Sequence, residues 1–158
     1  MKCDPEADGS YPDAPRPAVG AVVFKDDAVL LVQRAKAPAK GMWAIPGGSV
    51  RLGETLQAAA EREVLEETGV VIRAGEPVLV FDTIQRDEQD NILFHYVIVD
   101  LAAEYISGDP RAADDAADAR WVAQAELAHL NVNPATLHFL WDRFSFGRRE
   151  RRHDRKDN

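Results

Sequence analysis

The sequence is poor in cysteine, in long apolar runs and in positive charge. Cys3 is the only cysteine among 158 residues, so no disulfide bond can form within the chain. No apolar stretch approaches the roughly 20 residues that a membrane-spanning helix needs, and the N-terminal residues lack the apolar core of a secretory signal. We therefore expect a cytoplasmic protein that has no membrane partner.

The charge balance limits the partners further. Nineteen basic residues stand against 27 acidic ones, which gives a formal net charge of −8 at pH 7. Proteins that bind nucleic acids usually present a basic face, so the sequence predicts no nucleic-acid partner. A small phosphorylated substrate is compatible with this charge, because a bound metal ion can neutralise its phosphates.

The composition predicts one folded domain between two polar ends. Hydrophobic residues make up 46% of the chain and charged residues 29%, which is ordinary for a globular domain. Residues 1–16 are rich in Pro, Asp and Gly and predict a disordered arm. Residues 148–158 carry six basic and three acidic side chains, which predicts a solvated basic tail. A tail that binds polyanions and an expression remnant are the alternatives. The folded domain is therefore expected at residues 17–147.

Apolar periodicity predicts alternating strands and helices within this domain. Strand patterns occupy residues 18–24, 28–34, 43–46, 70–86, 91–101 and 119–124, and helical patterns occupy residues 55–68, 124–130 and 133–144. Lys25, Asp26 and Asp27 join the first two strands in a plausible hairpin. Mixed strands with interspersed helices predict an α/β fold, with a mixed sheet sandwiched by helices.

The helix at residues 55–68 carries an unusual set of glutamates. Thr55 is a good N-cap and Gly69 a good left-handed C-terminal residue. At about 100° per residue, an apolar stripe faces the protein; it consists of Leu56, Ala59, Ala60 and Val64. Glu63, Glu66 and Glu67 project from the same side, while Glu61 and Arg62 point elsewhere.

This arrangement of carboxylates favours a bound cation. Two like charges about 4 Å apart repel by about 4 kcal/mol at an effective dielectric constant of 20. Carboxylates without neighbouring histidine or cysteine are hard oxygen ligands, which suit Mg²⁺ or Mn²⁺. The turn with Gly47 and Gly48 allows a backbone carbonyl to approach the same ion. A solvated acidic face is the alternative.

The residues from Gly48 to Val70 resemble a known family signature. Gly48, Glu54, Arg62-Glu63-Val64, Glu66-Glu67 and Gly69-Val70 match every specified position of the Nudix box, G-x5-E-x7-R-E-U-x-E-E-x-G-U, where U is a bulky aliphatic residue. The resemblance extends from about Ala18 to Phe146. It implies a Nudix α/β/α sandwich that hydrolyses a nucleoside diphosphate linked to another moiety.

The same resemblance assigns roles to the box residues. Glu63 and Glu67 would be the principal metal ligands and catalytic residues, and Glu66 and the Gly48 carbonyl would assist. The ion would be Mg²⁺, with Mn²⁺ as a substitute. Glu54 and Arg62 would form a buried structural pair that orients the helix.

A base is still needed to accept the proton of the attacking water. In several Nudix families a carboxylate just before the tryptophan-bearing strand reaches the metal site, and this spacing selects Asp115, six residues before Trp121. Asp114 and Glu88 are the fallbacks. The alternative is that these residues belong to a flexible acidic surface loop without a catalytic role.

Three further side chains are candidates for contact with substrate. Arg34 closes the second strand and could bind a phosphate or form a salt bridge at the sheet edge. Trp43 could stack on a base or pack in the core, and the same holds for Phe24. His95 could line the cleft or be a satisfied sheet histidine.

The resemblance implies a small nucleotide as substrate, and the ADP-ribose pyrophosphatase branch of the family is the most similar one. ADP-ribose or a similar nucleotide sugar ranks first, although Gln85 stands where many ADP-ribose hydrolases carry proline. A (deoxy)nucleoside triphosphate pyrophosphohydrolase of the nucleotide-sanitising kind ranks second. A non-catalytic nucleotide sensor is the alternative from another class, and a homodimer is left open.

Overall fold

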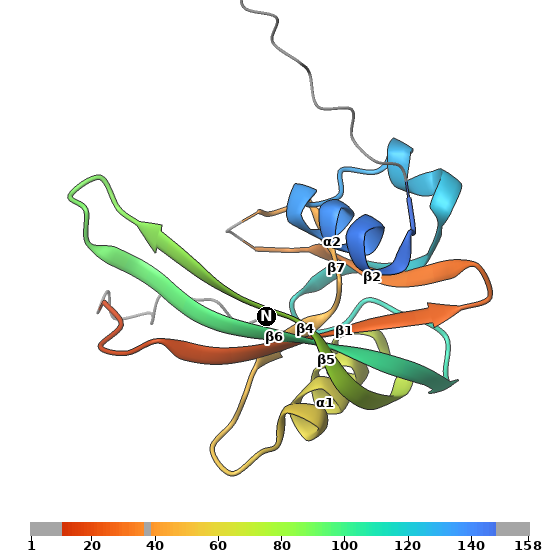
Figure 1. Cartoon of the computed structure of the whole chain (residues 1–158), viewed down its shortest axis with the longest axis horizontal. Coiled ribbons are helices and arrows are strands. Elements are labelled where there is room, and N and C mark those ends of the chain that lie inside the picture. The colour runs from red at the N-terminus through yellow and green to blue at the C-terminus, as the bar shows by residue number, and fades with distance from the viewer. Residues whose placement is uncertain (1–10, 37–38, 148–158) are drawn as a thin grey trace, which may run out of the picture.

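The computed structural model describes residues 11–36 and 39–147 (Figure 1). The predicted basic tail at residues 148–158 and most of the predicted arm lie outside the described residues. The first strand begins at Arg16, one residue before the expected start of the domain. The boundaries of arm, domain and tail otherwise stay predictions.

Seven strands and three helices make up the described fold. The strands are β1 (Arg16–Lys25), β2 (Ala28–Arg34), β3 (Trp43–Ala44), β4 (Gly47–Ser49), β5 (Val71–Arg86), β6 (Ile92–Ser107) and β7 (Ala116–Ala123). The helices are α1 (Leu56–Thr68), the 3₁₀-helix η1 (Gln124–His129) and α2 (Pro134–Phe144). Within the part of the chain that the structure describes, no helix is long and apolar enough to cross a membrane.

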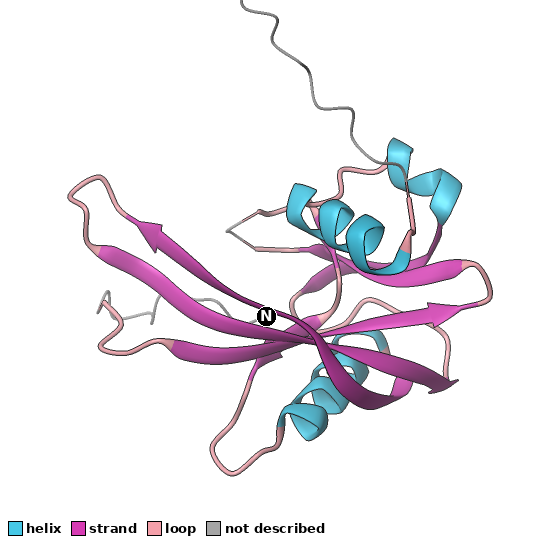
Figure 2. Ribbon diagram, in the orientation of Figure 1, coloured by secondary structure: helices cyan, strands magenta, loops and turns pink. Residues whose placement is uncertain are grey.

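The strands form one mixed sheet with the order β3-β2-β1-β6-β5. β4 pairs with β1 and β7 pairs with β2 outside this path. β1 and β6 are parallel, and the other named pairs are antiparallel. Helix α1 covers one side of the sheet and α2 the other, so the predicted α/β/α sandwich is confirmed (Figures 1 and 2).

Two strands differ most from the sequence expectation, β6 and the strand expected at residues 43–46, while the other strand ends shift by at most three residues. β6 continues to Ser107 because β5 pairs with it along its whole length, from Val71 opposite Ser107 to Arg86 opposite Ile92. The strand expected at residues 43–46 is two short strands. Pro46 has no N–H group for a ladder hydrogen bond, so β3 ends at Ala44 and pairing resumes in β4.

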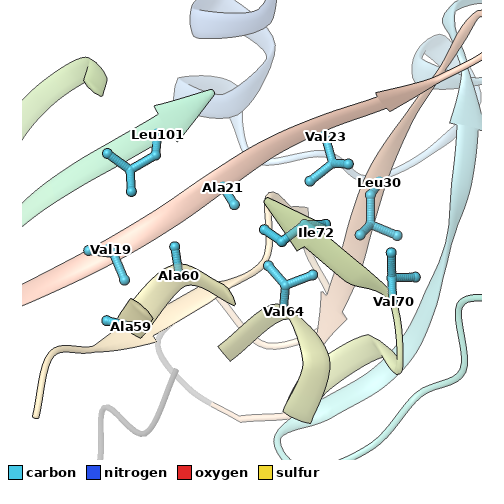
Figure 3. Close-up of a cluster of buried hydrophobic side chains, with 10 residues drawn as sticks. All are labelled: Val19, Ala21, Val23, Leu30, Ala59, Ala60, Val64, Val70, Ile72 and Leu101. Atoms are coloured by element: carbon cyan, nitrogen blue, oxygen red, sulfur yellow. The ribbon is translucent and has the colours of Figure 1, made fainter. Parts of the chain in front are cut away.

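The core lies on both faces of the sheet. On the α1 side, Val19, Ala21 and Val23 of β1 pack with Ala60 and Val64 of the helix (Figure 3). On the α2 side, a second cluster joins the helix to β1, β2 and β7. Helix α1 is therefore held firmly against β1, and this packing fixes where its glutamates lie.

Candidate active site

Helix α1 has the ends that the sequence predicts. The hydroxyl group of Thr55 accepts a hydrogen bond from the Ala58 N–H at 3.1 Å. Gly69 takes the left-handed conformation with φ of 73°, and its N–H donates to the Leu65 carbonyl at 2.9 Å. These caps fix both ends of the helix and therefore the direction of its side chains.

The glutamates of α1 differ in burial. Glu63 and Glu67 are only 9% and 2% exposed, and they lie beside the buried apolar stripe, as predicted. The side chain of Glu66 is 38% exposed and lies 3.5 Å from Arg51 Nη2. The carboxylates of Glu63 and Glu67 therefore point into the protein, whereas the side chain of Glu66 lies at the edge of the buried helix face, next to solvent.

Glu67 is held by the backbone of the glycine turn. Its Oε2 accepts a hydrogen bond from the Gly47 N–H at 3.1 Å. Burial raises the pKa of the Glu67 carboxyl group, and the charge of Glu63 raises it further, while the Gly47 N–H lowers it. A carboxylate in such a place is stabilised by a nearby cation.

Gly48 lies directly against Glu63. A Cβ atom added to Gly48 would lie only 2.5 and 2.6 Å from the two carboxylate oxygens of Glu63. Any larger residue would push the carboxylate away, so the glycine of the turn and the glutamate of the helix are matched in shape.

Replacing Gly48 with Ala should therefore destabilise the protein. The Cβ atom would displace the carboxylate end of Glu63, which accepts a hydrogen bond from Arg62 at 2.7 Å. Loss of such a bond costs about 1 kcal/mol, and we expect the free energy of unfolding in urea to fall by about that amount. Ser49→Ala is the matched control, because the Ser49 backbone carbonyl that Arg62 contacts is retained. An unchanged stability for Gly48→Ala would contradict the close packing of Gly48 on Glu63.

Arg62 bridges three of the glutamates. Its Nε and Nη2 donate to the two oxygens of Glu54 at 2.6 and 2.9 Å. Arg62 also lowers the pKa of Glu54 to about 2. Its Nη1 donates to Glu63 at 2.7 Å and to Glu66 at 3.2 Å.

These contacts correct one expectation about Arg62. The side chain was expected to point away from the carboxylate face, whereas it reaches along that face to Glu63 and Glu66. A guanidinium group carries five donors in a planar fork, so it can pair with Glu54 and still contact its helical neighbours.

The residues present fit a divalent cation. Glu63 and Glu67 offer hard carboxylate oxygens, and the burial of Glu67 favours a positive charge beside it. Within residues 11–36 and 39–147, no three His, Cys, Asp or Glu side chains are gathered closely enough to form a full ligand set. A cation here would therefore take further oxygens from water or substrate, as Mg²⁺ usually does.

A pocket of about 530 Å³ opens beside Glu67. Strands β5 and β6 form one wall, the end of β2 forms another, and α2 covers it. Arg34 and Asp115 line this pocket together with Glu67, as do the aromatic side chains Phe81, Phe94 and Tyr96. Its volume is that of a typical small-molecule site.

Asp115 is brought to this pocket by the loop before β7. The Ala113 N–H donates to the Glu67 carbonyl at 3.1 Å, and the Ala35 N–H donates to the Asp115 carbonyl at 3.1 Å. The loop is thereby tied to α1 on one side and to the end of β2 on the other. Asp115 Oδ1 forms an ion pair with Lys36 Nζ at 3.1 Å.

The second oxygen of Asp115 and the two fallback acids are placed differently. Asp115 Oδ2 is buried, and no donor in the described part of the chain reaches it. Asp114 is exposed in the turn, with φ of 54°, and Glu88 is exposed in the β5–β6 loop. Neither of these two acids lines the pocket.

Two aromatic candidates pack in the core. Trp43 is 4% exposed, belongs to the α2-side cluster and has the Arg120 guanidinium 4.7 Å from its ring centre. Phe24 contacts Phe144 and Phe146 with ring centres 5.2 Å apart. Neither Trp43 nor Phe24 lines the pocket, so their geometry is that of core packing, and the predicted substrate contact of Trp43 is corrected.

His95 also lies outside the pocket. Successive side chains of a strand point to opposite faces, and the neighbours of His95, Phe94 and Tyr96, are the ones that line the pocket. His95 is half-buried on the other face. The alternative of a histidine within the sheet is therefore the one that fits.

One buried acid was missed at the sequence level. Asp100 of β6 is 4% exposed and lines the pocket. Its signal in the sequence was a single carboxylate within the apolar run "YVIVDL". Such a residue cannot pack as a hydrophobic side chain does, and a buried carboxylate calls for a partner.

The chain resembles known proteins over most of its length. It is 36% identical over 107 residues to an ADP-ribose pyrophosphatase of Methanocaldococcus jannaschii, which covers 68% of this chain and 61% of that relative. A MutT NUDIX hydrolase from Burkholderia pseudomallei has a TM-score of 0.65 at 29% identity, over 84% of this chain and 99% of that one. The NUDIX domain of Shewanella oneidensis NrtR, complexed with ADP ribose, has a TM-score of 0.64 at 26% identity, over 87% and 88%.

The family model agrees with these similarities. The description of the NUDIX domain matches residues 14–142, which include the glycine turn, helix α1 and the pocket. The mixed sheet between two helical layers is the fold of the solved structures just named. On this evidence the chain belongs to the Nudix hydrolase family.

Proposed function

We propose that the protein hydrolyses a nucleoside diphosphate linked to another moiety, with ADP-ribose or a similar nucleotide sugar as substrate. The observation that carries the proposal is the buried pair Glu63 and Glu67, of which Glu67 lines a pocket large enough for a nucleotide. The archaeal relative named above is an ADP-ribose pyrophosphatase, and the NrtR domain was crystallised with ADP-ribose. Both similarities support ADP-ribose as the first candidate, while a putative 8-oxo-dGTP diphosphatase 2 of Mycobacterium tuberculosis, 33% identical over 78% of this chain, supports the triphosphate as the second.

In this proposal Glu63 and Glu67 would hold the metal ion, assisted by Glu66 and the Gly48 carbonyl, and the ion would be Mg²⁺. When bound, such an ion neutralises the diphosphate and makes water more acidic. Glu54 would keep Arg62 in place at the side of the cluster, because the two are joined by hydrogen bonds of 2.6 and 2.9 Å.

The remaining groups would act on water and on phosphate. Asp115 would accept the proton of the water that attacks phosphorus, while Arg34 would bind a phosphate oxygen. Both residues line the same pocket as Glu67, which supports these roles. Water adds across the phosphoanhydride bond of ADP-ribose, so the products would be AMP and ribose 5-phosphate.

A panel of nucleotides tests the proposal. The wild-type protein with Mg²⁺ is incubated with ADP-ribose, other nucleotide sugars, NADH and the common and oxidised (deoxy)nucleoside triphosphates, and the products are separated by chromatography. We expect ADP-ribose or a nucleotide sugar to have the highest kcat/KM. A triphosphate as the best substrate would replace this proposal by nucleotide-pool sanitising, and binding without turnover of any compound would indicate a sensor.

The ends of the chain should contribute little to this activity. The domain proposed at residues 17–147 contains every pocket residue named above. The described contact of the arm is an exposed hydrogen bond of 2.6 Å from the Tyr11 hydroxyl to Asp87. A chain without residues 1–15 and 148–158 should therefore hydrolyse its best substrate within about threefold of the full chain, since exposed contacts add little. A much larger loss on removing the basic tail would mean that the tail reaches the site.

A further inference from the structure

Strand β5 is an open edge of the sheet. It is the last strand in the order β3-β2-β1-β6-β5, and within residues 11–36 and 39–147 it pairs with β6 alone. Helix α1 covers only the first part of this edge. There the Gln57 amide donates to the Gly75 carbonyl at 3.3 Å, and Glu61 accepts from the Ala74 N–H at 2.9 Å. Beyond these contacts the hairpin of β5 and β6 projects past both helices (Figure 1).

The second half of β5 is exposed along its whole length. Every residue from Val80 to Arg86 is exposed, and Val80 and Ile84 are 62% and 49% exposed. Val97 of β6, which is 39% exposed, extends this apolar surface. Edge strands are often protected from pairing by lysine or proline, and residues 80–86 contain neither. This segment can therefore pair with a further strand.

The side chains of β5 favour pairing with a second copy of the same strand. Because side chains alternate along a strand, one face carries Val80, Asp82, Ile84 and Arg86. When two copies pair antiparallel about a two-fold axis at Ile84, Asp82 of one copy lies directly opposite Arg86 of the partner subunit. The symmetry forms this pair twice. Opposite charges across neighbouring strands stabilise a sheet, whereas like charges destabilise it.

Neighbouring registers lack this match. A two-fold axis at Asp82 would set the two Asp82 carboxylates against each other, and an axis at Thr83 would set Asp82 against Ile84. Arg86 is available for the pairing. Its Nη1 donates to the Asp90 carbonyl at 3.0 Å in the turn of its own hairpin, and the guanidinium group has further donors.

We propose that two copies of this chain associate through residues 80–86 of β5, which pair antiparallel about a two-fold axis at Ile84 and join the two sheets into one. In this register Thr83 lies opposite Gln85 of the partner subunit, and both of these positions line the pocket. Each pocket thereby gains a wall residue from the other copy. A single short strand pair buries less than the roughly 1,200 Å² of most stable interfaces, so the dimer should exchange with monomer. This inference does not depend on the proposed function.

Disulfide trapping tests the register. All variants carry Cys3→Ser, which removes the only native cysteine. Ile84→Cys sets two thiols at directly opposed positions, whose Cα atoms lie about 4.5–5.5 Å apart, within the range of a disulfide bond. We expect mild oxidation to link Ile84→Cys into a dimer on a non-reducing gel. Val80→Cys is the matched control, because it is exposed on the same face but its two Cα atoms would lie about 27 Å apart.

A mixture of two variants tests the same register at the charged positions. In the proposed dimer Asp82→Cys lies opposite Arg86→Cys, whereas each lies about 14 Å from its own counterpart. The mixture should therefore give a linked dimer, and neither variant alone should do so. The register would be wrong if Val80→Cys formed the dimer as readily as Ile84→Cys, or if Asp82→Cys alone did so as readily as the mixture.

Sedimentation velocity measures the association of the full chain without a disulfide. The average mass of the wild type should rise with concentration. Asp82→Arg should weaken the association by about tenfold, because it replaces two pairs of opposite charge by two pairs of like charge. Adding Arg86→Asp to it should restore the wild-type association. Glu104→Arg is the control, since Glu104 is 74% exposed at the other end of the hairpin strands and should have no effect.

The remaining outcomes overturn the proposal. A wild type that is monomeric at every concentration, together with an Ile84→Cys variant that does not link, would exclude this dimer. Slow hydrogen exchange of the β5 amides in such a monomer would show that another segment of the chain covers the edge. A dimer that Asp82→Arg leaves intact and Ile84→Cys does not trap would place the interface elsewhere. Absence of hydrolysis in the nucleotide panel would contradict the proposed function alone.

Discussion

Glu67→Gln should abolish almost all hydrolysis while the protein remains folded. Glutamine keeps the shape of the side chain and an oxygen for the Gly47 N–H, which lies 3.1 Å from the carboxylate. It removes the negative charge that would hold the metal ion. Loss of residues that merely support a metal ligand costs about 10–100-fold, so we expect loss of this proposed ligand to lower kcat by at least about 10³-fold.

The same substitution should leave the protein equally stable or more stable in a metal-free buffer. Burial raises the pKa of Glu67 above its ordinary value of 4.5, so the folded protein holds this proton more tightly than the unfolded chain does. The wild type therefore loses stability as the pH rises above about 4.5, because the unfolded chain then gives up the proton first. Glutamine does not titrate, so the gain in melting temperature over wild type should be larger at pH 8 than at pH 5.

An exposed glutamate provides the control for both measurements. The side chain of Glu104 on β6 is 74% exposed and is paired only loosely with Arg73, at 3.6 Å. Glu104→Gln should keep the wild-type rate and melting temperature, because exposed ion pairs of this kind contribute little. If Glu67→Gln retained more than a tenth of the wild-type rate, the metal-binding role of Glu67 would be wrong.

The glutamate helix could be read from the sequence because its determinants are local. Thr55 and Gly69 mark its ends, and the burial of Glu63 and Glu67 follows from the helical period. The alternation of strands and helices is local in the same sense, and it led to the correct layers. Glu66 and Arg62 departed from expectation because side chains of this length reach beyond the direction that the helix gives them.

The remaining differences depend on contacts between distant segments. The sequence pattern around an aromatic residue does not show whether its ring packs in the core or lines a cleft. Trp43 lies in the core, where its ring packs against the Arg120 side chain from β7. The surroundings of Asp100 depend on the parallel register of β1 and β6, which places it opposite Gly20. The register between two strands depends on the packing of the whole sheet, so it could not be predicted from the sequence of either strand alone.

Asp115→Asn should lower kcat by about 10²–10⁴-fold, the usual contribution of general acid–base assistance. Asp115 is the acid of the β6–β7 loop that lines the pocket with Glu67, whereas Asp114 is exposed in the turn beside it. Lys36 holds Oδ1 at 3.1 Å, and Oδ2 has no donor among the described residues. Oδ2 is therefore the oxygen that would accept the proton of the attacking water, after a rotation of the side chain exposes it.

A base and a metal ligand can be told apart by two further measurements on Asp115→Asn. The apparent affinity for Mg²⁺ should change little, because the buried carboxylates of Glu63 and Glu67 remain. The loss in kcat should also shrink towards high pH, where hydroxide replaces the missing base. Asp114→Asn and Glu88→Gln are the parallel variants, and both should stay near the wild-type rate. If Asp115→Asn is near neutral and one of these is not, that residue is the base; if all three are near neutral, a glutamate of α1 must accept the proton.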